Sequence, residues 1–306
     1  MGSGSTESGP GLAQKKLVKL THKRLERFVT LVPKFLLSDD PDTIHDLRVW
    51  SRRLQQSLRI ILAEAKSPAS RKVVRTLRRV RRALGSCRNL DVNIDLARQR
   101  SREAQSPILR EGWETLETYL KKNRESLLAS ARKEVAKHDL VTFIERARKA
   151  VARADLDADP TPRLETAMAR SMSEWDEAYR LAEESRSIAN LHAWRIATKR
   201  LRYRAELLVN SGSVVSPPLV EDLKDIQAAL GDWHDRCVFL ESAAAFLARQ
   251  NFLLQHPNMG GALLADMEKE NARNDAAIES VLTRAAKARK RWTVRGEKQA
   301  AKSANQ

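Results

Sequence analysis

Cysteine, aromatic residues and long apolar segments are all scarce in this 306-residue sequence, and two of these shortages exclude whole classes of protein. The two cysteines, Cys87 and Cys237, are too few for a disulfide framework or a cysteine zinc site. No apolar run approaches the roughly 20 residues of a membrane span, and no signal-peptide pattern begins the chain. We therefore expect a cytoplasmic protein with reduced thiols and no membrane contact.

Strand signals are missing as well, because no alternating run of β-branched residues is bounded by turn residues. Apolar residues recur instead with the 3.6-residue period of helices. The sequence thus predicts an all-α fold, with helices over residues 12–37, 43–65, 69–84, 90–104, 108–137, 140–154, 163–183, 188–210, 218–230, 235–250 and 259–289. Residues 1–11 are predicted to be a flexible linker, and residues 291–306 a basic disordered tail.

Acidic residues are few where basic residues are densest. Residues 44–102 hold sixteen Lys or Arg against four acids, and so carry +12 of the net charge of +17. The basic side chains of two successive helices each fall on one side: His45, Arg48, Arg52 and Arg59, then Arg71, Arg75, Arg78 and Arg82. Like charges at this spacing destabilise a helix, and no acid occurs between residues 71 and 85. This pattern favours an anion-binding surface over a merely solvated one.

An internal repeat predicts the domain organisation. The pattern H-x-x-R-x-x-x-[KR]-R-L begins at His45 and again at His192, 147 residues later. About forty residues after each histidine comes a second motif, and its two copies, residues 84–92 and 230–238, also match each other. Within that pair, Gly85 and Gly231 are each expected to end one helix just before the next begins. Two matches in the same order predict a tandem of helical repeats, residues 12–158 and 159–290.

These duplicated motifs resemble those of the CHAD domain family, a histidine-containing α-helical domain, over about residues 12–290. The resemblance implies two four-helix-type bundles related by a pseudo-twofold axis, with a basic central groove or pore that binds inorganic polyphosphate, and an association with polyphosphate granules. The positions that match the family motifs are His45, Arg48, Arg52, Arg53 and Arg88 in the first repeat, and His192, Arg195, Lys199 and Arg200 in the second. Arg59, Arg71, Arg75, Arg78, Arg82, Arg202 and Lys224 complete the set of predicted polyphosphate ligands.

The second repeat is less basic than the first. Residues 191–250 contain eight basic residues and seven acids, and Glu221 and Ala228 stand at the positions that match Arg75 and Arg82. His234 replaces Arg88, and a histidine can be neutral at pH 7. The first repeat is therefore expected to supply most of the binding energy.

Two other functions remain open. A nucleic acid would present the same phosphates, although single-strand recognition uses exposed aromatic residues, which make up only 5% of this chain. A phosphate-transferring enzyme would use His45 and His192 as phospho-acceptors, but no acid–base pair accompanies either histidine. The Arg and Lys that follow each histidine would also repel a metal ion. We expect a non-enzymatic polyphosphate-binding protein without a cofactor or metal, for which nucleic acid is a weak ligand.

Overall fold

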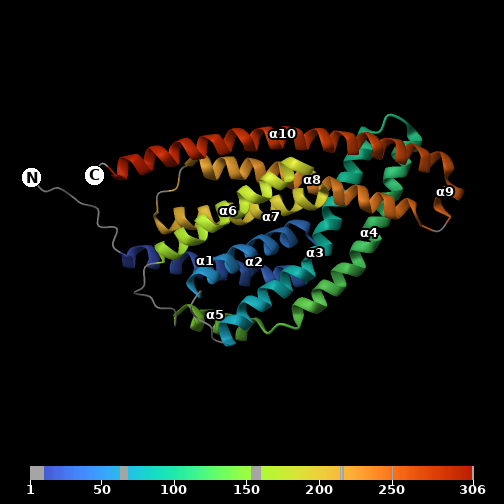
Figure 1. Ribbon diagram of the computed structural model, residues 1–306. Coiled ribbons are helices and arrows are strands. Elements are labelled where there is room, and N and C mark those ends of the chain that lie inside the picture. The colour runs from blue at the N-terminus through green and yellow to red at the C-terminus, as the bar shows by residue number, and fades with distance from the viewer. Residues whose placement is uncertain are drawn as a thin grey trace, which may run out of the picture. The chain divides into compact units, whose positions relative to one another are not determined.

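The computed structural model describes residues 10–62, 68–152, 160–213, 215, 217–249 and 251–304. Over these residues the regular structure is helical and contains no strand, which confirms the predicted all-α fold. The helices, labelled in Figure 1 where there is room, are α1 (Pro10–Leu37), α2 (Pro41–Ile61), α3 (Pro68–Glu103), α4 (Pro107–Ala136), α5 (Leu140–Ala152), α6 (Thr161–Ser185), α7 (Ile188–Ser211), α8 (Pro217–Leu247), α9 (Phe252–Gln255) and α10 (Pro257–Ala304).

Two long helices, α3 and α8, each take the place of two shorter helices that the sequence predicts. α3 continues through Gly85 and α8 through Gly231, so the prediction that each glycine ends a helix was wrong. Neither glycine has the positive φ of a helix-ending conformation. Leu84 and Leu230 are fully buried beside them, and this packing offsets the cost of about 1 kcal/mol for glycine inside a helix.

The C-terminal residues also differ from expectation, because α10 extends through residues 291–304, which were predicted to be disordered. Nine of these fourteen residues are Ala, Lys, Arg, Glu or Gln, which favour helix. Extending an existing helix requires no new nucleation. Residues 1–9 of the predicted linker and residues 153–159, where the two repeats were predicted to divide, lie outside the described residues.

The described chain forms two compact units, each built from three separate segments. Unit 1 falls within Met1–Asp91, Lys121–Arg170 and Tyr203–Val214, and unit 2 within Val92–Leu120, Ser171–Arg202 and Val215–Gln306. Helices α3, α4, α6 and α7 contribute residues to both units. The division into repeats at residue 158 describes the sequence rather than these units, and it stays a prediction.

In unit 1, α1 packs alongside α2 and also contacts α5 (Figure 1). Phe28 of α1 is buried against Phe143 of α5, with ring centroids 5.5 Å apart. Arg24 of α1 is buried too, and its Nη1 donates to the carbonyl of Arg53 (2.9 Å) and to Ser57 Oγ (2.6 Å) on α2. These contacts hold α2 against α1.

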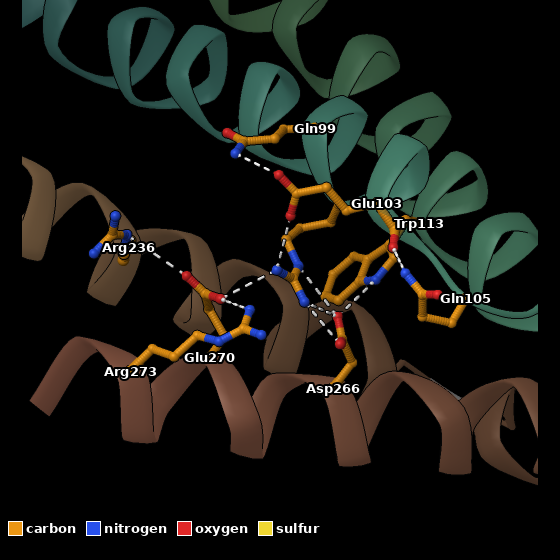
Figure 2. A network of polar contacts seen from close by, with 9 residues as sticks. Gln99, Glu103, Gln105, Trp113, Arg236, Asp266, Glu270 and Arg273 are labelled. Atoms are coloured by element: carbon orange, nitrogen blue, oxygen red, sulfur yellow. Dashed lines mark hydrogen bonds and ion pairs between the residues drawn. The ribbon is translucent and has the colours of Figure 1, made fainter. Parts of the chain in front are cut away.

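In unit 2, α8 lies alongside α10 (Figure 1). A charged network shown in Figure 2 joins α10 to α3 and α4: Arg100 of α3 pairs with Asp266 (2.6 Å) and Glu270 (3.2 Å), and the Trp113 indole donates to Asp266 (3.1 Å). Because these arginine and carboxylate charges neutralise one another, the network holds helices together rather than presenting net charge to a ligand.

Candidate anion-binding site

The basic sides of α2 and α3 meet around Arg81 in unit 1. Arg48 of α2 donates from Nη1 to the carbonyl of Arg81 (3.2 Å), and the Arg81 guanidinium donates to the side-chain oxygen of Gln55 on α2. A Cβ atom at position 85 would lie 3.3 Å from Arg48 Nη1. Glycine at this position therefore gives the Arg48 guanidinium room to lie against α3.

Arg81 is surrounded by positive charge. Its pKa is lowered to about 10, first by burial and then by the charges of Arg52, Arg48, Arg59 and Arg78. Repulsion among like charges lowers the pKa of a cation because it disfavours the charged form. A bound anion would relieve this repulsion.

Arg81 and Gln55 are site residues that the sequence analysis missed. Arg81 lies beside the stripe of Arg71, Arg75, Arg78 and Arg82 rather than on it. The run of arginines at 78, 79, 81 and 82 was the available signal. The spacing of α3 alone does not reveal that Arg81 faces α2.

A pocket of about 460 Å³ adjoins this cluster. Its lining residues come from α2, α3 and the residue that follows α2: Leu58, Arg59, Leu62, Ser70, Arg71, Val74, Arg75 and Arg78. The volume lies within the range of small-ligand sites. Four predicted ligands therefore share one concave site whose apolar surface strengthens nearby electrostatic interactions.

The α3 arginines of this pocket are exposed. Arg71, Arg75 and Arg78 form no ion pair with any carboxylate in the described part of the chain. Their charge is therefore not cancelled within the described protein, unlike that of Arg100.

Arg48 and Arg88 continue the positive surface away from the pocket, and the imidazole of His45 lies near them. The pKa of His45 is lowered, first by partial burial and next by the charge of Arg88, with a smaller effect of Arg48. From Arg71 to Arg88, α3 rises about 26 Å at 1.5 Å per residue. We call this whole surface the arginine row: His45, Arg48, Arg52, Arg59, Arg71, Arg75, Arg78, Arg81 and Arg88.

Two predicted ligands of the first repeat are not part of the arginine row. The Arg53 guanidinium lies over the Trp50 ring, 5.1 Å from its centroid, and the Arg53 charge acts on buried Arg24. Arg82 is exposed on α3, but it neither lines the pocket nor contributes to the pKa shift of Arg81.

A smaller basic cluster occurs in unit 2, where the second motif places His192, Arg195 and Lys199 on α7. The rings of His192 and His234 lie 5.1 Å apart between centroids. The pKa of His234 is lowered to about 4, first by burial and then by Arg195, His192 and Lys199. His234 is therefore neutral at pH 7 and can offer a ligand a hydrogen bond but no charge.

Other predicted ligands in unit 2 are neutralised by acids. Lys224 pairs with Glu221 (2.7 Å), and Arg200 pairs with Glu174. Arg202 is half-buried on α7. Lys224 and Arg200 are therefore neutralised at least in part by their neighbours, unlike Arg71, Arg75 and Arg78.

Neither metal binding nor membrane crossing gains support from the described residues. They contain no group of three or more His, Cys, Asp or Glu side chains placed to hold a metal ion. None of their helices combines the length and apolar character needed to cross a membrane.

Comparisons with known proteins agree with the helical architecture. A model of the CHAD domain matches residues 19–244. The crystal structure of the CHAD domain from the plant Ricinus communis is similar, with a TM-score of 0.67 and 21% sequence identity over 88% of this chain and 91% of that chain. PptA from Streptomyces chartreusis is also similar, with a TM-score of 0.56 and 15% identity over 88% of this chain and 99% of that chain. No curated protein sequence matches significantly.

At such low identities the two solved structures establish the fold alone. The family model adds the sequence relationship, since its match includes the motifs that begin at His45 and His192. That match extends over most of the sequence, and the chain therefore belongs to the CHAD domain family.

Proposed function

We propose that this protein binds inorganic polyphosphate through the arginine row of unit 1, with the His192–His234 cluster of unit 2 as a weaker contact. The observation that carries the proposal is the group of like-charged guanidinium ions around Arg81, together with the exposed pocket residues Arg71, Arg75 and Arg78, which form no ion pair with a carboxylate among the described residues. A guanidinium binds phosphate oxygens with two parallel hydrogen bonds. A row of them suits a polymer that repeats the same charge along its length.

Membership of the CHAD family supports this ligand, because the family resemblance implies polyphosphate binding in a basic groove. It also supports a role in polyphosphate granules or polyphosphate metabolism. Trp194 is fully buried and Tyr203 nearly so, so neither ring is available to stack on bases, as single-stranded nucleic acids require. We propose binding without catalysis, because the site groups cations and because Asp46, the acid next to His45, pairs with Arg27 (3.1 Å).

A competition titration tests the proposal. Long-chain polyphosphate would be titrated at fixed salt and competed with RNA, DNA, ATP and orthophosphate at equal phosphate concentration. Polyphosphate should win, and its affinity should fall linearly on a log–log salt plot because binding releases counterions. A flat salt response, or stronger binding of RNA, would contradict the proposal.

A second measurement tests the absence of catalysis. Polyphosphate incubated with the protein and added divalent metal should keep its chain length and release no phosphate. Phosphate release that is lost in the double variant His45→Ala, His192→Ala would show that the protein is an enzyme.

A further inference from the structure

A second basic pocket lies in unit 1 on a different side of α3 from the arginine row. Its volume is about 270 Å³, and its lining residues are Lys72, Val73, Thr76, Lys137, His138, Asp139, Thr142, Phe143 and Arg146. Lys72 follows Arg71 directly in α3, but successive helix positions point about 100° apart. The two neighbours therefore line two different pockets.

Three cationic side chains surround this pocket. Lys72 of α3 and Arg146 of α5 form no ion pair with a carboxylate in the described segments. Lys137, at the end of α4, pairs with Glu134 (2.7 Å). Thr76 adds a hydroxyl group to the lining, and a hydroxyl can donate to an anion. The pocket thus combines positive charge with neutral donors.

The carboxylate of Asp139 is the one acid among the lining residues, and it is already engaged. It accepts hydrogen bonds from the backbone N–H of Thr142 (3.1 Å) and from the Thr142 hydroxyl, and so caps the start of α5. These contacts hold its pKa below the usual range. Its charge is thereby directed toward the helix end, and the lining keeps a net positive charge.

His138 supplies a further polar group. Its Nε2 atom is buried and has no hydrogen-bond partner among the described residues. Burial lowers the pKa of this imidazole, while Glu134 raises it and Arg79 and Lys137 lower it further. A buried nitrogen without a partner costs free energy, which a ligand that hydrogen-bonds to the imidazole would recover.

We propose that this pocket binds one phosphate group, carried by a small phosphate ion or by the end of a polyphosphate chain. Lys72 and Arg146 supply charge, and His138 and Thr76 supply hydrogen bonds. The pocket is smaller than the one on the arginine row, so it suits a compact anion rather than a long polymer. The site is separate from the arginine row and does not depend on that row binding polyphosphate.

The imidazole of His138 reports on this pocket directly, because no histidine lines the pocket of the arginine row. The His138 resonances would be assigned by loss in His138→Gln and followed by NMR during titration with pyrophosphate at constant pH and ionic strength. We expect a saturable movement of these resonances. No movement at saturating pyrophosphate would refute the proposal.

Matched variants on α3 separate the two pockets. Lys72→Glu should weaken the pyrophosphate effect on His138 by about tenfold or more, the value of one charge-assisted hydrogen bond. Arg71→Glu, at the neighbouring exposed position, should change it by less than about threefold, the size of a weak screened interaction. Equal weakening by both variants would show that general charge, and not this pocket, moves the resonances.

Further titrations identify the source of the phosphate group. Orthophosphate that acts as strongly as pyrophosphate would support binding of a free phosphate ion, whereas a response to tripolyphosphate but not orthophosphate would support binding of a chain end. Long-chain polyphosphate binding by Lys72→Glu would be measured in parallel. If this variant still binds long-chain polyphosphate, the arginine row functions without the second pocket.

Discussion

Charge reversal of Arg75 and Arg78 gives the sharpest test of the arginine row. Both side chains line the pocket on α3 and are exposed. A charge-assisted hydrogen bond is worth about 1.5–3 kcal/mol. Because exposed charges are screened by solvent, we take the lower value for each contact. The double variant Arg75→Glu, Arg78→Glu should then lose about 3 kcal/mol, or about a hundredfold in polyphosphate affinity.

The control keeps the helix and the charge change the same. Arg79→Glu, Arg82→Glu also reverses two exposed charges on α3, but neither residue lines the pocket of the arginine row or the second pocket. Only long-range attraction should be lost, which amounts to about fivefold or less at physiological salt. Lys224→Glu in unit 2 should cost less than about tenfold, one contact at most, because Lys224 already pairs with Glu221.

Each variant would be checked by circular dichroism and then titrated with long-chain polyphosphate at one salt concentration. Helix content should be retained, because Val73, Leu77, Val80 and Leu84 form the buried side of α3. Equal losses in the two double variants would refute the arginine row as a specific site. A loss from Lys224→Glu as large as that from the Arg75 and Arg78 pair would move the main site to unit 2.

Three further predictions concern stability and its relation to binding. Gly231→Ala, where a Cβ meets nothing within 4 Å, should raise the free energy of unfolding measured by urea denaturation by about 0.5–1 kcal/mol, because alanine favours helix, with no change in polyphosphate affinity. Gly85→Ala should give a smaller gain and weaker polyphosphate binding, because its Cβ would displace Arg48 from the Arg81 carbonyl. The pKa of His234, lowered to about 4 by burial and neighbouring cations, lies below the ordinary value of about 6.5, so the stability linked to its neutral form is present above pH 6.5 and is lost as the pH falls toward 4. When the pH falls from 7 to 5, the free energy of unfolding should therefore decrease by about 1 kcal/mol less in His234→Gln than in the unmodified protein, after allowance for solvent screening. An equal decrease in the two proteins would contradict this. Asp266→Ala removes one of three carboxylates that pair with Arg100, as well as the acceptor of the Trp113 indole. It should lower the free energy of unfolding by about 1–3 kcal/mol without changing the affinity for polyphosphate. A loss below about 1 kcal/mol would show that the network contributes little.

The internal repeat had the most predictive value in the sequence. Its two histidine motifs identified the family that the comparison with the CHAD model confirms. The 3.6-residue period likewise predicted the helices, because each must bury one apolar side. It also placed Arg71, Arg75 and Arg78 on a side of α3 that the structure leaves exposed.

Helix ends were predicted less well, for a physical reason. Glycine and short polar residues after residue 84 suggested a helix stop, but local preferences of about 1 kcal/mol are weaker than the burial of Leu84 and of Cys87 beyond it. Tertiary packing therefore decided that α3 continues. In this helix Gly85 does not form a turn. Its missing side chain lets Arg48 lie close to α3.

The sequence by itself determined the fold class, the family and the excess of positive charge in the first repeat, because these depend on residue types and on spacing along one helix. Only the tertiary structure decided which charges act together. Arg81 meets Arg48 and Gln55 across two helices, Lys224 and Arg200 are cancelled by Glu221 and Glu174, and Lys72 and Arg71 enter different pockets. Electrostatic interactions depend on distance in space and on burial, and neither can be read from the order of residues along the chain.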